Sequence, residues 1–128
     1  MGHDLTIPDL VHVSRQLPPN IRFSDASINR MARNRAFAET IADRGDQVYG
    51  LTTGVGVRKK RIIPAKEMAL YNKRMLRDHA TGHGESLPYC IVHAATILLL
   101  NTLAAGRSNV RPEVAKHILK KLRKGKYF

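Results

Sequence analysis

The chain of 128 residues is poor in cysteine, tryptophan and acidic side chains. Cys90 is its single cysteine, which excludes an internal disulfide and a metal site built from several cysteines. A reducing compartment suits such a sequence, so we expect a cytoplasmic location. The first residues, MGHDLT, lack the basic and then apolar pattern of a signal peptide.

Acidic residues are scarce, with 10 Asp and Glu against 22 Lys and Arg, which gives a formal charge of +12. Such an excess points to nucleic acid, to an anionic membrane surface or to an acidic partner chain. The run of four basic residues at 58–61 resembles a solvated loop edge more than a phosphate site, because no aromatic residue interrupts it. Composition alone leaves these alternatives open.

Long apolar runs are also missing, except at residues 89–105. This stretch is shorter than the roughly 20 residues that a membrane span needs, and it contains His93 and Asn101. We therefore expect no membrane segment. A helix this apolar is typically buried in protein, often inside an oligomer, and we expect a partner or a second copy to cover it.

The remaining patterns predict a mainly α-helical fold and a single unit over residues 1–128. Short strands are expected near the N-terminus, at residues 5–7 and 21–23. Helices are expected from Ser24 or Ser27 to about Arg44, from Pro64 to just before Gly82, from Pro88 to Gly106, and from Pro112 onward. In the second helix Met68, Tyr71, Met75 and His79 share one face, so His79 follows the apolar stripe.

His79 and His83 are four residues apart and imitate a helical metal-binding pair, with Glu85 nearby. Gly82 and Gly84 interrupt the helix that such a pair requires, and no third ligand is evident. We expect no metal site. Cys90 has no activating neighbour in the sequence and is predicted to be a small buried hydrophobic residue.

Glycines at positions 50, 54 and 56 make residues 48–56, VYGLTTGVG, the most flexible stretch of the chain. Tyr49 stands at its entrance. Since no Gly-Lys-Ser or Gly-Lys-Thr follows, the stretch is not a phosphate-binding loop. Considered alone, it predicts a mobile loop with a packing tyrosine.

Two later segments change that interpretation: RDHATGHGE at residues 77–85 and NTLAAGRSNVRPE at residues 101–113. In this order and spacing, the three segments resemble the N-terminal part of the histidine and aromatic amino-acid ammonia-lyases and their aminomutase relatives. The resemblance extends from about Leu5 to Lys124 and implies the N-terminal portion of that fold. Asn109 replaces a usual glycine, which is tolerable because asparagine accepts left-handed backbone angles.

The resemblance assigns roles to the loop at residues 48–56, which we call the lid loop. It implies that Tyr49 is the base that removes a β-proton from the bound amino acid. The lid motif around it is matched by Gly50, Thr53, Gly54 and Gly56. A tyrosine can act in this way only where its surroundings stabilise the phenolate.

The resemblance also implies that Asp78 and His79 contact the substrate side chain. Members with a Ser-His pair at this point act on histidine or tyrosine; here His79 matches and Asp78 departs from the pattern. A carboxylate at this position favours a cationic or hydroxylated side chain. The identity of the amino acid is therefore left open, and so is the choice between elimination and migration of the amino group.

The family's electrophile, methylidene-imidazolone, forms from an internal Ala-Ser-Gly that this sequence lacks; Ala26-Ser27 is followed by Ile28. We therefore expect the chain to be inactive alone and to need a complementary chain that carries the imidazolone. The prediction is an N-terminal segment or subunit of an aromatic amino-acid ammonia-lyase or aminomutase. Alternatives are a non-catalytic regulatory or scaffold subunit and a basic helical nucleic-acid-binding module. The last explains the charge but not the three ordered motifs.

Overall fold

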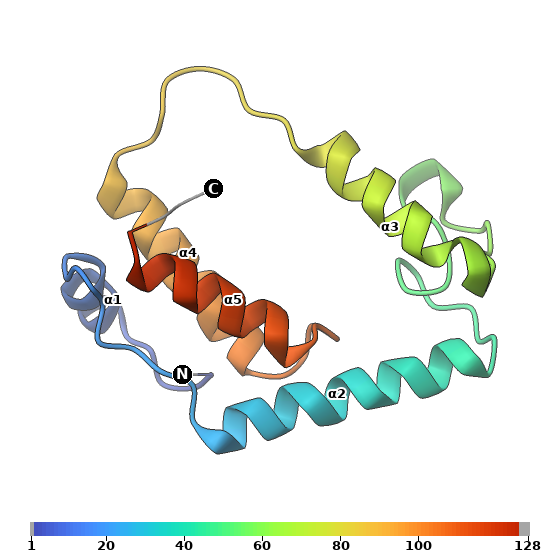
Figure 1. The fold of residues 1–128 in the computed structure, drawn as a ribbon, viewed down its shortest axis with the longest axis horizontal. Coiled ribbons are helices and arrows are strands. Elements are labelled where there is room, and N and C mark those ends of the chain that lie inside the picture. Colours follow the sequence, from blue (N-terminus) through green and yellow to red (C-terminus); the bar gives the residue numbers. More distant parts are fainter. Residues whose placement is uncertain (1, 126–128) are drawn as a thin grey trace. The chain divides into compact units, whose positions relative to one another are not determined.

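A computed structural model describes residues 2–125 of the chain (Figure 1). These residues fall into two compact units: unit 1, the described part of Met1–Ala36 and Ser86–Phe128, and unit 2, Phe37–Glu85. The prediction of one unit over the whole chain stays a prediction. The helices are α1 (Ile7–Ser14), α2 (Asp25–Asp43), the short 3-10 turn η1 (Gly56–Arg58), α3 (Ala65–His79), α4 (Tyr89–Ala104) and α5 (Pro112–Arg123).

The mainly α fold is confirmed, and α2, α4 and α5 begin where serine and proline predicted, whereas α1 was not predicted and α3 ends at His79, ahead of Gly82. The Ser24 hydroxyl caps α2 by accepting the Ser27 backbone N–H at 3.3 Å. Gly45 follows α2 with a φ of +76°, and Gly106 follows α4 with a φ of +71°, both in the left-handed region. Proline stands before α3 and α4 and at the first position of α5.

The predicted strands near the N-terminus are wrong. Ile7 is the first residue of α1, because Thr6 and Asp9 form a reciprocal capping box that starts a helix there. Residues 21–23 belong to no strand. Within residues 2–125 the structure shows one isolated antiparallel bridge, Thr53 to Ile62. A three-residue extended segment becomes a strand only beside a pairing partner, which neither segment has here.

Helices α1, α4 and α5 form the centre of unit 1, with α4 packed against both of the others (Figure 1). Two hydrophobic clusters lie between these helices and the start of α2. Their buried members are Ile97, Leu100, Leu119 and Leu122 in one cluster and Met31, Leu103 and Ala115 in the other. Phe23 and Ile118 are half-buried and pack against both clusters.

Within this chain helix α4 is buried along one side, and the expectation that a partner or a second copy covers its other side stays a prediction. Ile97 and Leu100 are 1% and 0% exposed, whereas Ile91, Leu98 and Leu99 remain about half exposed, at 52%, 47% and 47%. No helix within residues 2–125 is long and apolar enough to cross a membrane.

Polar contacts also join the helices of unit 1 to one another. The buried His93 ring donates its Nδ1–H to the Ser14 carbonyl at 2.6 Å and so joins α4 to α1. The Arg30 guanidinium donates to the Ala104 carbonyl at 3.2 Å, beside Gly106. Asn109 has a φ of +53°, which confirms the expected left-handed angle, and its N–H donates to the Asn34 side chain at 2.8 Å.

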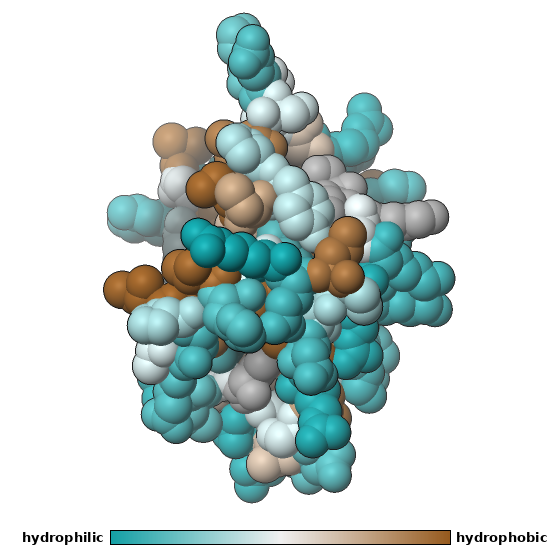
Figure 2. Space-filling view, turned by 90° about the vertical axis from the view of Figure 1, so that its left-hand side faces the viewer, coloured by the Kyte–Doolittle hydropathy of each residue, from teal (hydrophilic) through white to brown (hydrophobic). Residues whose placement is uncertain are grey.

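Helix α5 presents Lys116, Lys120 and Arg123 outward and buries Leu119 and Leu122. Val114 is 48% exposed, whereas Ala115, one residue further round the helix, is buried. The face of the molecule drawn in Figure 2 is mostly hydrophilic, with hydrophobic side chains in small separate groups. Scattered exposed apolar residues of this kind are normal for a protein surface.

Candidate active site

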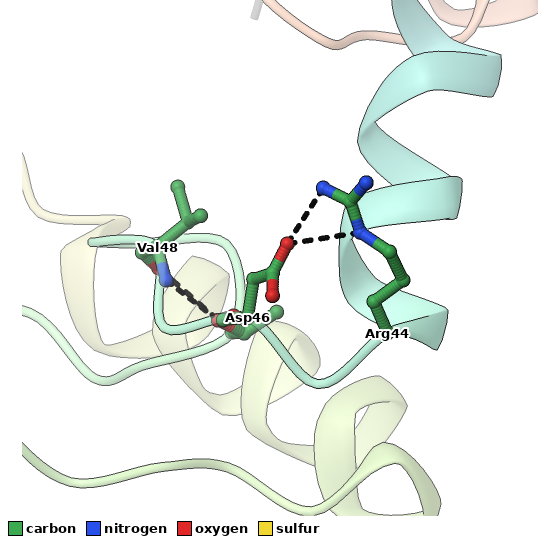
Figure 3. A network of polar contacts seen from close by, with 4 residues as sticks. Arg44, Asp46 and Val48 are labelled. Atoms are coloured by element: carbon green, nitrogen blue, oxygen red, sulfur yellow. Dashed lines mark hydrogen bonds and ion pairs between the residues drawn. The ribbon is translucent and has the colours of Figure 1, made fainter.

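All the predicted site residues lie in unit 2, where the lid loop follows the end of α2. Figure 3 shows the Arg44 side chain reaching the Asp46 carboxylate, with Nη2 and Nε 2.6 and 3.0 Å from Oδ2. The Thr52 hydroxyl donates to the Asp46 carbonyl at 2.5 Å and accepts the Val48 N–H at 2.8 Å. These contacts fold the entrance of the lid loop back on itself.

The middle of the lid loop is anchored by backbone hydrogen bonds. The Gly54 N–H donates to the Arg61 carbonyl, and the Ile63 N–H donates to the Thr52 carbonyl, both at 2.9 Å. Thr52, Thr53 and Gly54 are buried. A Cβ atom at Gly54 would lie 2.7 Å from the Arg58 carbonyl oxygen, closer than real Cβ contacts, so glycine is needed here for the close backbone approach.

Tyr49 projects from the anchored part of the loop, with 65% of its surface exposed. Its hydroxyl oxygen accepts the N–H of Gly56 at 3.4 Å. Gly50 and Gly56, on either side, have φ angles of +71° and +57°, as the glycine pattern predicted. The phenol group is thus presented at the surface of unit 2 and touches the backbone of its own loop.

Asp78 and His79 are the last two residues of α3, and both side chains are exposed. The His79 ring donates its Nδ1–H to the Met75 carbonyl at 2.8 Å, one turn back along the helix. In the neutral ring this contact places the proton on Nδ1 and leaves Nε2 as an acceptor. Met68, Tyr71 and Met75 are half-buried, so His79 extends their stripe but lies beyond its buried part.

A groove of about 660 Å³ runs along α3 within unit 2. It combines an apolar floor with three arginines and two carboxylates, and Asp78 is one of the latter. Neither Tyr49 nor His79 lines it, so the groove does not bring the predicted site residues together. Its lining is Val55, Val57, Arg58, Arg61, Ile63, Glu67, Leu70, Tyr71, Arg74, Met75 and Asp78.

The structure describes no group of three His, Cys, Asp or Glu side chains within residues 2–125 that is placed to hold a metal ion. His83 and Glu85 are exposed. Cys90 is exposed as well, so its predicted burial is wrong. It lies in the first turn of α4, before the buried side of that helix begins at His93.

Sequence reasoning missed two residues that shape this region. Tyr71, predicted only as part of an apolar stripe, accepts the Val55 N–H through its hydroxyl at 3.2 Å. Thr52 is buried and hydrogen-bonds across the loop entrance. Two adjacent threonines inside a glycine-rich stretch were the available signal for Thr52; nothing in the sequence marked the Tyr71 hydroxyl.

Comparison with known proteins now identifies the family. Residues 5–127 match the family described as aromatic amino acid lyase. The chain belongs to this family. The resemblance inferred from the three motifs is therefore confirmed. A histidine ammonia-lyase from Gloeobacter violaceus is 39% identical over 124 residues, and one from Alkaliphilus oremlandii is 31% identical over the same length.

Solved structures agree with this assignment. The ergothioneine-degrading enzyme ergothionase from Treponema denticola, in complex with desmethyl-ergothioneine sulfonic acid, matches with a TM-score of 0.90 and 28% identity, over 97% of this chain and 25% of that one. Tyrosine aminomutase from Streptomyces globisporus matches with a TM-score of 0.84 and 27% identity, over 97% and 23% of the two chains. The fold is thus an N-terminal segment of the aromatic amino acid lyase fold.

The chain spans about a quarter of the length of the curated relatives that it matches. The alignment with the Gloeobacter violaceus enzyme covers 97% of this chain and 24% of the relative. This chain contains the lid loop and the end of α3.

Proposed function

We propose that this chain is the N-terminal segment or subunit of an aromatic amino-acid ammonia-lyase or aminomutase, of the histidine or tyrosine type. It supplies Tyr49 as the base on the lid loop and His79 as a contact for the substrate side chain. A complementary chain supplies the rest of the lyase fold. The observation that carries the proposal is the exposed phenol of Tyr49 on an anchored loop, in a chain that belongs to this family.

A base on a loop must be both presented and oriented. The Tyr49 side chain meets the first requirement because most of it is exposed. The Gly56 N–H, 3.4 Å from the phenol oxygen, supports the second. In this role the phenol oxygen takes a proton from the carbon next to the one that bears the amino group.

His79 offers a directional contact to a substrate side chain. Its Nδ1–H is taken by the Met75 carbonyl, so Nε2 is the atom that accepts a hydrogen bond from a substrate hydroxyl or ring N–H. Asp78, also exposed at the end of α3, adds a negative charge beside it. This pair favours a substrate side chain that donates hydrogen bonds, as histidine and tyrosine side chains do.

The residues of this chain do not fit the imidazolone electrophile. Its one Ala-Ser pair, Ala26-Ser27, lies inside α2 and is followed by Ile28 rather than glycine. Ser27 is fully buried, and its hydroxyl accepts a hydrogen bond from Arg30 at 2.9 Å. We propose that residues outside this sequence provide that group.

The proposal is tested by combining the full chain with a complementary chain that carries Ala-Ser-Gly and measuring mass, ammonia release and product absorbance. We expect an active assembly, and we expect Tyr49→Phe to lower kcat by roughly 10² to 10⁴-fold, the usual contribution of a general base. Tyr89→Phe in unit 1 is the matched control and should retain activity.

Two results separate the alternatives. An assembly that forms and whose activity survives Tyr49→Phe would make the chain a non-catalytic regulatory or scaffold subunit. Binding to nucleic acid with a steep salt dependence, without a protein partner, would instead support the basic helical module.

His79→Ala, with His83→Ala as its control, should raise KM for the amino acid if His79 contacts the side chain.

A further inference from the structure

Two consecutive backbone N–H groups of the lid loop are held by two different tyrosine hydroxyls. The Val55 N–H donates to the Tyr71 oxygen at 3.2 Å, and the Gly56 N–H donates to the Tyr49 oxygen at 3.4 Å. Tyr71 belongs to α3, whereas Tyr49 belongs to the lid loop itself. Residues 55–56 therefore form a link between α3 and the Tyr49 phenol.

The geometry of Val55 explains how one contact affects the other. Val55 is extended, with φ −116° and ψ 162°, so its N–H and the following N–H of Gly56 point to opposite sides of the chain. Each peptide group is planar, and only two dihedral angles separate the two N–H directions. Fixing the first N–H on Tyr71 therefore limits where the second can point.

The rest of the lid loop is attached elsewhere. Thr52 and Gly54 are hydrogen-bonded to Ile63 and Arg61, on the return segment that leads to α3. Among the residues that the structure describes, the hydrogen bond from the Val55 N–H to the Tyr71 hydroxyl is the one that joins the lid loop to α3. Tyr71 is half-buried and also lines the groove along α3 together with Leu70 and Met75.

We propose that Tyr71 is a positioning residue for Tyr49. Its hydroxyl fixes Val55, and through Val55 it fixes the Gly56 N–H that meets the Tyr49 phenol oxygen. The catalytic part of this inference rests on the proposed function, in which Tyr49 is the base. The structural part, a hydroxyl on α3 that sets the position of the lid loop, does not.

The structural part is tested on the full chain by amide hydrogen exchange measured with NMR. Tyr71→Phe keeps the ring and removes only the acceptor, so we expect exchange at Val55 to accelerate roughly fivefold, the effect of one net hydrogen bond. Gly56 should follow, and the ring resonances of Tyr49 should shift. Far-ultraviolet circular dichroism checks that the helices are retained.

Tyr49→Phe is the companion variant. It removes the acceptor of Gly56 only, so exchange should accelerate at Gly56 and stay within about twofold at Val55. Tyr89→Phe in unit 1 should change neither amide. Unchanged exchange at Val55 in Tyr71→Phe, or an equal response of both amides to Tyr49→Phe, would overturn the inference whatever the assembled enzyme does.

The catalytic part is tested in the active assembly. A displaced base slows the chemical step more than it weakens binding, so Tyr71→Phe should lower kcat roughly tenfold and leave KM within about twofold. An unchanged kcat would overturn the positioning role. Activity that survives Tyr49→Phe would count against the proposed function, while the exchange results would still decide whether Tyr71 holds the loop.

Discussion

Unit 1 buries Ile97, Leu100 and Leu122 almost completely, whereas α3 in unit 2 contains no buried residue. Both hydrophobic clusters belong to unit 1. Unit 2 holds its chain together chiefly through backbone and threonine hydrogen bonds at the lid loop. The charge differs too: unit 1 has 13 of the 22 basic residues and only 4 of the 10 acidic ones.

The residues that form the buried core and the residues proposed to meet a substrate therefore lie in different units of this short chain. Residues with few buried apolar contacts open at low free-energy cost, and binding loops are commonly drawn from such regions. Tyr49, Asp78 and His79 all lie in the less buried unit. Unit 1 supplies the packed helices, and unit 2 presents the side chains proposed to meet a substrate.

The largest expected effect comes from removing core volume in unit 1. Leu100→Ala should lower the free energy of unfolding by about 2–5 kcal/mol, because Leu100 is 0% exposed and its methyl groups leave a cavity. Leu76→Ala on α3, where Leu76 is 77% exposed, is the matched control and should stay within about 0.5 kcal/mol. Urea unfolding followed by circular dichroism measures both. Equal losses would contradict the contrast between the units.

An intermediate effect is expected at two glycines that end helices with nearly the same φ. Gly45→Ala should cost about 1–2 kcal/mol, since its φ is +76° but nothing lies within 4 Å of an added Cβ. Gly106→Ala should lower the free energy of unfolding by about 1–3 kcal/mol more than Gly45→Ala does, because its Cβ would lie 2.8 Å from the Arg30 Cβ. Thermal unfolding of the two variants gives the difference. Identical losses would show that packing adds nothing at Gly106.

The smallest effect concerns the capping box of α1, at the edge of unit 1. The Thr6 hydroxyl donates to the Asp9 carboxylate at 2.6 Å and, with the Thr6 N–H, lowers the Asp9 pKa below its ordinary value. The folded state therefore favours the carboxylate. This small stabilisation is complete above the ordinary pKa of about 3.9 and is lost as the pH falls through the lowered pKa.

Thr6→Val should raise the Asp9 pKa toward its ordinary value, whereas Thr6→Ser, which keeps the hydroxyl, should leave it low. Carbon-13 NMR of the Asp9 carboxyl through an acid titration measures the pKa in each variant. An Asp9 pKa that does not respond to Thr6→Val would assign the shift to the Thr6 backbone N–H, which this variant keeps.

Local sequence signals located the helices well. Ser24, Gly45 and Pro112 mark helix ends through caps, left-handed angles and a fixed φ, and each acts over a few residues without help from the rest of the chain. The strand prediction at residues 5–7 failed because a local helix signal competes with it there. Apolar alternation there is brief, and the Thr6–Asp9 capping box, also a local signal, outweighs it.

The sequence by itself determined the helical fold and the family, because these follow from short motifs and periodicity. Only the tertiary structure decided that Cys90 is exposed, that α4 is buried on one side and that Tyr71 holds Val55. Each of these depends on which segments meet in space. A contact between Val55 and a residue 16 positions later leaves no trace in local spacing, since it exists only once α3 and the lid loop pack within unit 2.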